Sequence, residues 1–288
     1  MRAAWDKASD VFSDLTPVLG ELRLIKDASE IQAMREAARI SVAAHERVMQ
    51  AAPNAQYEYE LEAEFIYALG QAGCREMAYD AIVAGGSRAC TLHYTMNNQA
   101  LQAGELLLID AGAEVNGYAS DITRTYPING VFSTEQRLIY ELVLRAQAAG
   151  IACVKPNAPW ASIQTAVVET LTAGLVELGL LHGDIDTLIA DKAYALFYMH
   201  SAGHWLGLDV HDVGSYQVEG VSRLLQPGMA LTVEPGLYIA ADCEQVDKKW
   251  RGIGIRIEDD ILVTRTGHEN LTEALIKKPD DLERFVRG

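Results

Sequence analysis

The sequence predicts an α+β protein made of two similar halves. Segments with helical spacing of apolar residues come first, and short apolar strands that carry carboxylates follow them. The same order, helices and then acid-bearing strands, returns in the second half of the chain. Because separate runs of helices and strands are typical of α+β proteins, we expect a duplicated α+β unit.

The main domain is expected to begin after residue 24. Residues 1–24 look like a short appended segment, in which Trp5, Phe12 and Leu15 offer only modest packing. Residues 25–288 then form a single domain, since 288 residues with 49% hydrophobic side chains suit one large domain or two fused halves with a shared core.

Each half has recognisable helix and strand signals. Ser29 and Gln32 resemble a capping box, so the first helix is expected to start there and to end at Pro53. The other expected helices cover residues 58–70, 134–150, 160–180 and 184–196. The expected strands cover residues 79–84, 106–110, 229–234, 253–264 and 270–277.

Composition excludes several classes of protein. The formal net charge of −16 disfavours nucleic acid or an anionic membrane as a partner. No apolar run reaches the roughly 18 residues that a membrane span needs, and the first ten residues lack the apolar core of a signal peptide. Four widely spaced cysteines, Cys74, Cys90, Cys153 and Cys243, are expected to be reduced thiols of a cytoplasmic protein.

A hairpin places two of the acids side by side. Asn116-Gly117 predicts a two-residue turn, so the numbers of facing positions add to 233. Asp121 then lies opposite Gly112, on the same face as Asp110, and the two carboxylates become diagonal neighbours with Cα atoms roughly 7–8 Å apart. Two unrelated acids at strand ends would give the same pattern, so this pair alone leaves both interpretations open.

Five residues in apolar or glycine-rich surroundings are candidate metal ligands: Asp110, Asp121, His204, Glu234 and Glu258. Carboxylates in apolar strands are costly to bury unless a positive charge pairs with them. Oxygen-rich ligation with one imidazole favours manganese, cobalt or magnesium over a structural zinc site. Four carboxylates suit two ions about 3.5 Å apart.

Each candidate also has a simpler interpretation. Strand alternation places Arg256, Glu258 and Asp260 on one face, so Arg256 is either a plain salt-bridge partner of Glu258 or a residue that orients a metal-binding carboxylate. Glu234 is either a solvated strand end or a ligand that points into a cleft, and His204 alone would be a core histidine. His93, His200 and His211 accompany the five candidates, whereas His45, His182 and His268 are expected to be structural or surface residues.

Five stretches resemble one known family. TLHY, LLLIDAGAEVNGYASDITRTYP, HWLGLDVHDVG, PGMALTVEPGLYI and RGIGIRIEDDILVT are similar to the proline-specific metallopeptidases of the pita-bread fold, and most similar to bacterial aminopeptidase P, the Xaa-Pro aminopeptidases. The similarity runs from about residue 22 to residue 279. It implies two pseudo-symmetric α+β halves around a metal cleft.

The resemblance implies a dinuclear site with divalent ions, manganese first and cobalt or zinc as alternatives. Asp121 and Glu258 would bridge the two ions, Asp110 would complete one, and His204 and Glu234 the other. Glu234 would also act as general base on a bridging water.

The remaining roles concern the substrate, a peptide with proline in second position. His93 and His211 would contact the substrate and stabilise its tetrahedral intermediate, and His200 would line the proline pocket. Arg256 and Tyr238 would hold the aspartate that completes one ion.

Other functions stay open. A prolidase shares most of these motifs. A methionine-aminopeptidase-like enzyme is a second alternative, although the flanks HWLG and GIGIRIEDD resemble the proline-specific group, and a non-catalytic binding protein on the same fold is a third. The usual amino-terminal domain of the family is missing from this sequence, so we expect a monomer or homodimer with weaker selection of substrates.

Overall fold

The computed structural model describes residues 14–288. The expected packing of Trp5 and Phe12 lies outside these residues, and Leu15 is exposed. The first helix, α1 (Thr16–Leu24), ends at the predicted domain boundary, and its Leu24 is buried against the rest of the chain.

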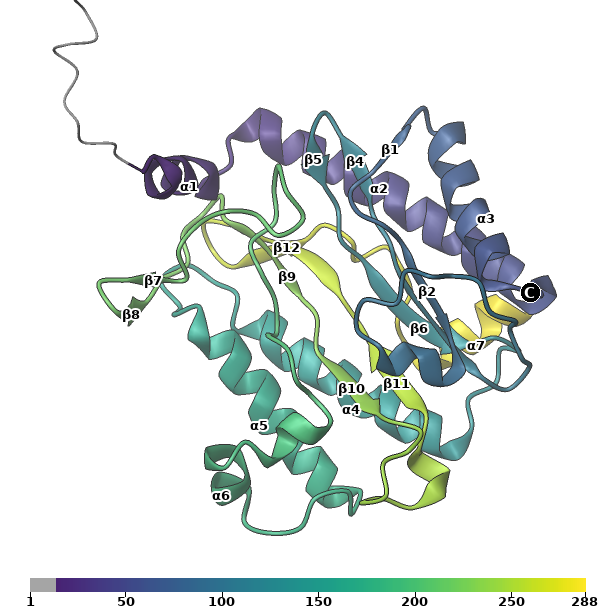
Figure 1. Ribbon diagram of the computed structural model, residues 1–288. Helices are drawn as coiled ribbons and strands as arrows, with labels where there is room; N and C mark the ends of the chain where they lie inside the picture. The colour runs from purple at the N-terminus through teal and green to yellow at the C-terminus, as the bar shows by residue number, and fades with distance from the viewer. Residues whose placement is uncertain (1–13) are drawn as a thin grey trace, which may run out of the picture.

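The first half pairs two helices with antiparallel strands. After α1 its elements are α2 (Ala28–Ala51), η2 (Ala52–Asn54), α3 (Glu58–Gln71), β1 (Glu76–Met77), β2 (Ile82–Gly85), η3 (Gly86–Cys90), β3 (Leu106–Asp110), β4 (Ala113–Val115), β5 (Tyr118–Ala119) and β6 (Thr123–Pro127). One sheet has the order β2-β3-β6 and another the order β1-β4-β5. Helix α2 packs on α3 and on the β4–β5 hairpin (Figure 1).

The second half repeats this plan. Its elements are α4 (Thr134–Ala152), α5 (Ala161–Glu177), α6 (Ile185–Ala190), η4 (Ala193–Leu196), β7 (Gln217–Val218), β8 (Val221–Ser222), β9 (Ala230–Val233), β10 (Gly236–Ile239), η5 (Lys248–Trp250), β11 (Ile253–Arg256), β12 (Asp259–Val263), β13 (His268–Asn270) and α7 (Pro279–Arg287). Helix α4 packs on α5 and on strands β9, β10 and β11 (Figure 1). The α+β prediction with two similar halves is therefore confirmed.

The predicted hairpin register is confirmed along its whole length. Val115 pairs with Tyr118 across the turn, and Asp110 pairs with Thr123 at the far end, so facing residue numbers add to 233 throughout. Asn116 and its neighbouring glycine both have positive φ, as a tight hairpin turn requires.

Four details of the predicted elements are wrong. The first long helix is capped by Asp27, whose carboxylate accepts from the backbone of Ser29 and Glu30, so the capping box lies two residues earlier than expected. The predicted 184–196 helix breaks at Lys192, which has positive φ. The predicted 253–264 strand breaks at residues 257–258, between β11 and β12. The last predicted strand, 270–277, is also wrong, because β13 covers only His268–Asn270.

The two halves meet where β6 crosses the break between β11 and β12. The Thr125 hydroxyl donates to the carbonyl oxygen of Arg256 at 2.9 Å, and the backbone N–H of Glu258 donates to the carbonyl oxygen of Thr123 at 3.1 Å. A large apolar core continues across both halves. Hydrogen bonds between the two halves therefore fix the backbone at the acidic residues of this junction.

Two predictions made from the composition, on the cysteines and on membrane spans, can be compared with the structure. All four cysteines are free thiols, as expected. Within residues 14–288, no helix is long and apolar enough to cross a membrane.

Candidate active site

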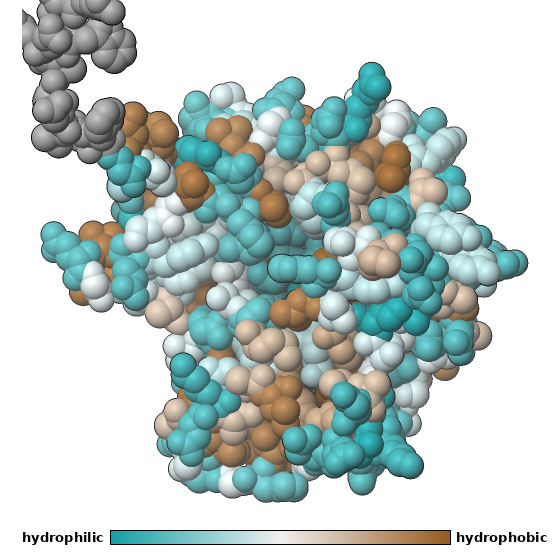
Figure 2. All heavy atoms as spheres, viewed as in Figure 1, coloured by the Kyte–Doolittle hydropathy of each residue, from teal (hydrophilic) through white to brown (hydrophobic). Residues whose placement is uncertain are grey.

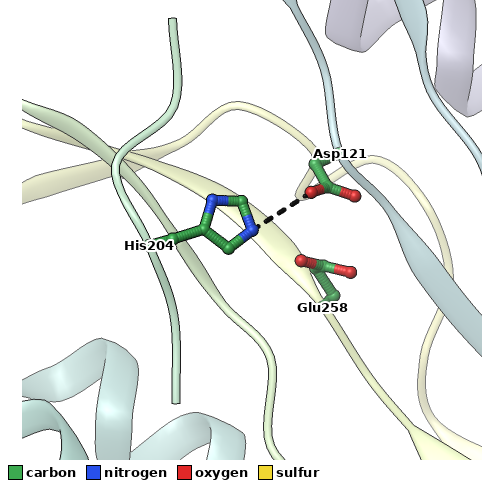
Figure 3. Close-up of side chains that lie close together, drawn as sticks. All are labelled: Asp121, His204 and Glu258. Atoms are coloured by element: carbon green, nitrogen blue, oxygen red, sulfur yellow. Dashed lines mark ion pairs between the residues drawn. The ribbon is translucent and has the colours of Figure 1, made fainter. Parts of the chain in front are cut away.

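Three of the predicted ligands converge on one point. Oxygen or nitrogen atoms of Asp121, His204 and Glu258 all lie within 4.8 Å of one another, and Figure 3 shows the three side chains pointing toward a common centre. The Nε2 atom of His204 lies 3.3 Å from Oδ2 of Asp121. Asp121 and Glu258 are buried.

Backbone pairing fixes His204. Its chain segment runs beside β9, where the N–H of Thr232 donates to the His204 carbonyl oxygen at 2.9 Å. Gly203 permits this approach, because a Cβ atom there would lie 2.0 Å from the carbonyl oxygen of Thr232. The imidazole Nδ1 lies 3.0 Å from the carbonyl oxygen of Trp205 and therefore carries a proton, which leaves Nε2 as the nitrogen that faces the carboxylates.

Glu234 lies at the edge of the same cluster. It follows β9, and its N–H donates to the Ala202 carbonyl oxygen at 2.8 Å. Its Oε1 atom lies 3.7 Å from Nε2 of His204, and 16% of its side chain is exposed. The side chain therefore faces the cavity and is not a solvated strand end.

Asp110 joins the cluster through its hydrogen-bond partners. The Arg256 guanidinium donates to Oδ2 of Asp110 at 2.6 Å, and the Tyr79 hydroxyl lies 2.6 Å from Oδ1 of Asp110 and 2.5 Å from Oδ1 of Asp121. Tyr238 accepts a hydrogen bond from Arg256 at 3.0 Å. Arg256 thus pairs with Asp110, not with Glu258 as one interpretation of the strand alternation had it.

The cluster holds more acidic than basic side chains. Burial raises the pKa of Glu258 well above its usual range, and the charges of Asp121 and Glu234 raise it further. Burial likewise raises the pKa of Glu234 to about 7. Burial disfavours protonated His204, but the hydrogen bond and charge of Asp121 outweigh it and raise the pKa of His204 to about 9.

This donor set fits divalent cations. Arg256 is the one arginine or lysine among the described residues that line the cavity, against four carboxylates. Hard cations prefer carboxylate oxygens, and Nε2 of His204 adds one nitrogen when a cation displaces its proton. Asp110, Asp121, His204, Glu234 and Glu258 are thus the residues that would hold such ions.

The other predicted histidines also lie at the cavity. His93 and His211 line it, and the ring of His211 lies 4.3 Å from that of His204. His200 donates from Nδ1 to the Ser201 carbonyl oxygen at 2.8 Å and accepts at Nε2 from the Tyr238 hydroxyl at 2.8 Å. Burial, followed by the charge of Arg256, lowers the pKa of His200 to about 4, so the ring is neutral.

The three histidines predicted to be structural or surface residues lie elsewhere. His45 is buried against the Ala111 carbonyl oxygen, at 2.9 Å. His268 bonds to the Val154 carbonyl oxygen at 2.8 Å, and His182 is exposed. This prediction is confirmed.

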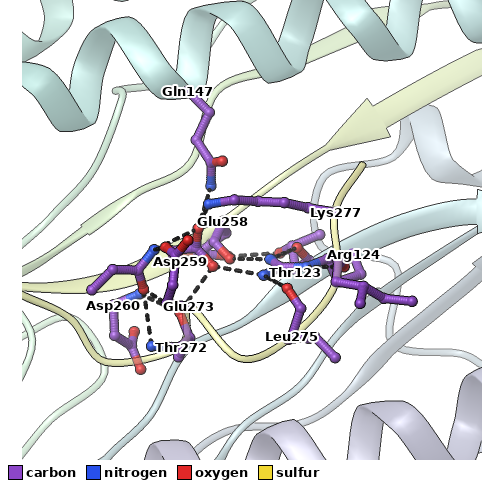
Figure 4. Close-up of polar contacts among 12 residues, drawn as sticks. Thr123, Arg124, Gln147, Glu258, Asp259, Asp260, Thr272, Glu273, Leu275 and Lys277 are labelled. Carbon is purple, nitrogen blue, oxygen red and sulfur yellow. Dashed lines mark hydrogen bonds and ion pairs between the residues drawn. The ribbon is translucent and has the colours of Figure 1, made fainter. Parts of the chain in front are cut away.

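A buried polar network holds the backbone at Glu258. Arg124 donates from Nη1 to the Glu258 carbonyl oxygen at 2.6 Å and from Nη2 to Asp259 at 2.7 Å (Figure 4). Lys277 and Thr272 also bind the carboxylate of Asp259. This network fixes the backbone at the strand break, so the Glu258 side chain can turn toward the cluster.

Sequence reasoning missed three residues of this region. Tyr79 lies between two acids, and Asp260 accepts from Ser120 at 2.8 Å and from the backbone of Asp121. Lys26 pairs with Asp212, the neighbour of His211. Single tyrosines, acids and lysines are common in any sequence, so no local signal marked these residues.

The cavity has a volume of about 620 Å³. Figure 2 shows a hollow near the middle of this face, with hydrophilic residues gathered in it. The lining combines the acids and Arg256 with Trp160, Tyr216, Gln217 and Ser222. A cavity of this size accepts a short peptide.

Two α+β halves around a cleft lined with carboxylates define the class of pita-bread metalloproteins. The model of metallopeptidase family M24 matches residues 32–265. The chain belongs to this family.

Curated relatives and solved structures agree. The chain is 48% identical to Xaa-Pro aminopeptidase of Escherichia coli over 95% of its own length and 62% of the relative. It is 39% identical to a probable Xaa-Pro aminopeptidase of Podospora anserina, over 96% of the chain and 65% of the relative. The solved aminopeptidase PepP of Pseudomonas aeruginosa matches with a TM-score of 0.95 and 51% identity, over 99% of this chain and 65% of that chain. The predicted pita-bread fold is confirmed, and the chain spans less than two thirds of the length of these relatives.

Proposed function

We propose that this chain is the catalytic portion of a metal-dependent aminopeptidase that hydrolyses the bond between the first residue of a peptide and a proline in second position. The convergence of Asp121, His204 and Glu258 carries the proposal. The named activity of the curated relatives supports the choice of substrate.

Asp110, Asp121, His204, Glu234 and Glu258 would hold two divalent ions, with manganese first because four of the five donors are carboxylates. When bound, the ions would lower the pKa of a shared water and polarise the peptide carbonyl. Free thiols at all four cysteines support a cytoplasmic location. The expected monomer or homodimer stays a prediction.

Glu234 is the proposed general base. Its carboxylate faces the cavity next to His204 and would accept the proton of the attacking water. The carbonyl carbon gains an oxygen, the bond to the proline nitrogen breaks, and that proton passes to the nitrogen. His93 and His211, which line the same cavity, would donate hydrogen bonds to the carbonyl oxygen as its negative charge develops.

His200 is the proposed wall of the proline pocket. Its neutral ring is held by Tyr238, which also contacts Arg256, so pocket wall and Asp110 share one chain of hydrogen bonds. A rigid ring at this position would orient the proline and thereby the bond to be cut.

Three peptides test the function. We expect the manganese-loaded protein to hydrolyse Ala-Pro-Ala faster than Ala-Pro or Met-Ala-Ala. Faster cleavage of Ala-Pro would identify a prolidase, and faster cleavage of Met-Ala-Ala a methionine-aminopeptidase-like enzyme. If elemental analysis shows bound metal but none of the three peptides is cleaved, a non-catalytic binding protein is favoured.

A further inference from the structure

The cavity lining includes two aromatic residues that the proposed reaction does not use. They are Trp160 and Tyr216, whose ring centroids lie 4.6 Å apart. Tyr216 is 38% exposed, and Trp160 is partly exposed. We call this pair the aromatic ledge.

A buried third ring supports the aromatic ledge. Trp205 is fully buried, lies 4.3 Å from the ring of Trp160 and stacks on Tyr216 at 5.5 Å with an interplanar angle of 13°. Its chain neighbour is His204, one of the three convergent residues. The aromatic ledge thus packs on the chain neighbour of a candidate ligand and lines the same cavity as the three convergent residues.

Backbone contacts hold the aromatic ledge in place. The Trp160 N–H donates to the Arg223 carbonyl oxygen at 2.8 Å, and the Ala161 N–H donates to the Ser222 hydroxyl at 2.9 Å. These bonds join the start of α5 to strand β8 of the β7–β8 hairpin, which projects from the molecule beside α5 (Figure 1). A ledge fixed by two elements is ordered before a ligand arrives, so less entropy is lost on binding.

The direction of the peptide follows from charge and exposure. Its first residue carries an ammonium group, which the buried carboxylates attract, and the remaining chain must leave by the exposed side of the cavity. Tyr216 and Gln217 are among the exposed lining residues, together with His93, Ser201 and His211, and a peptide that leaves past Tyr216 passes the aromatic ledge. Consecutive Cα atoms are about 3.8 Å apart, so with the first two residues at the cluster the third reaches the rings beside it.

We propose that the aromatic ledge of Trp160 and Tyr216 is a subsite for the side chain that follows proline, and that it selects an aromatic residue in third position. This proposal rests on the proposed function. Stacking on exposed rings adds to the burial of the side chain, so we expect Ala-Pro-Phe to exceed Ala-Pro-Ala in kcat/KM by roughly 2- to 10-fold, mainly through KM.

Variants of one residue test the subsite. Trp160→Ala should lower the ratio of kcat/KM for Ala-Pro-Phe to that for Ala-Pro-Ala to about one. Trp160→Phe keeps an aromatic ring and should retain most of the preference for Ala-Pro-Phe. Val218→Ala, in the same hairpin but outside the cavity lining, should leave the ratio unchanged. A preference that survives in a folded, metal-loaded Trp160→Ala protein would overturn the proposal, and so would a wild-type ratio of one.

A binding measurement separates this proposal from the function. Calorimetry with Pro-Phe and Pro-Ala, dipeptides that lack the bond to be cut, should show tighter binding of Pro-Phe to the wild-type protein and equal binding to Trp160→Ala. If no tripeptide is cleaved but this difference holds, the subsite stands and the proposed function fails. If tripeptides are cleaved but both dipeptides bind the wild-type protein equally, the subsite fails alone.

Discussion

The ammonium of Lys26 lies 3.1 Å from Oδ2 of Asp212, and only 1% of each side chain is exposed. Asp212 directly follows His211, and the guanidinium of Arg23 also pairs with Asp212. The chain just after α1 therefore anchors the loop that carries a proposed substrate-binding histidine.

Replacement of Lys26 should destabilise this loop. Lys26→Met leaves a buried carboxylate with Arg23 as its one remaining cationic partner among the described residues, so we expect a loss of about 3 kcal/mol in the free energy of unfolding. Lys26→Arg keeps a positive charge and should therefore retain part of the stability that Lys26→Met loses. Urea unfolding monitored by circular dichroism measures the loss, and an unchanged free energy in Lys26→Met would contradict the role of the pair.

Loss of Asp121 should remove both metal ions. We propose that its carboxylate bridges them, so Asp121→Ala leaves each ion without a shared ligand. Elemental analysis after dialysis against manganese should give two ions for the wild-type protein and none for the variant. Asp242→Ala, which removes an exposed acid, is the control. One ion retained at full occupancy in Asp121→Ala would rule out bridging.

Turnover should depend on the Glu234 carboxylate. Glu234→Gln keeps the size of the side chain but cannot accept the proton of water, so we expect kcat to fall roughly 10²- to 10⁴-fold, with weakened metal binding adding to the loss. Kinetics at saturating manganese, with circular dichroism as the check of folding, measure this. A kcat near that of the wild-type protein would exclude Glu234 as the base.

His93 and His211 should act on the substrate and not on the metal. Both line the cavity outside the three convergent residues, so His93→Ala and His211→Ala should lower kcat and retain both ions. Metal analysis beside steady-state kinetics tests each variant. A variant that loses an ion would show that its histidine is a ligand and that the set of five is incomplete.

His45 should make stability depend on pH. Burial in the core against Phe65 lowers the pKa of His45 from 6.5 to about 4, and it outweighs the hydrogen bond to the Ala111 carbonyl oxygen, which acts in the opposite direction. Above pH 6.5 the ring is neutral in both states. As pH falls from 6.5 toward 4, the unfolded chain binds a proton that the folded chain does not, so stability decreases, by at most about 3 kcal/mol. His45→Gln should show a shallower decrease in urea unfolding over this range. Equal slopes for both proteins would contradict the assignment.

Local sequence signals predicted the hairpin and its register well. The Asn116-Gly117 turn depends on the backbone preferences of those two residues, so its geometry follows from the sequence alone. Asp110 and Asp121 were therefore correctly placed as near neighbours, and a shared hydroxyl of Tyr79 now links them.

Contacts between distant segments could not be read in this way. The break between β11 and β12 depends on Arg124, which lies more than a hundred positions earlier and holds the Glu258 carbonyl oxygen. The pairing of Lys26 with Asp212 is likewise set by how α1 docks on the fold. Alternation within a strand carries no information about such partners, so the sequence left the partner of Arg256 open.

Asp121 and Glu258 come from different halves of the chain, and they meet only when β6 lies against the break between β11 and β12. A cation that touches both carboxylates therefore binds the docked halves and not the separated ones. By mass action, a ligand present at 100 times its Kd adds about 2.7 kcal/mol to the stability of the state it binds. The concentration of free metal ion would therefore change the resistance of the folded chain to heat and proteolysis, independently of any peptide it cleaves.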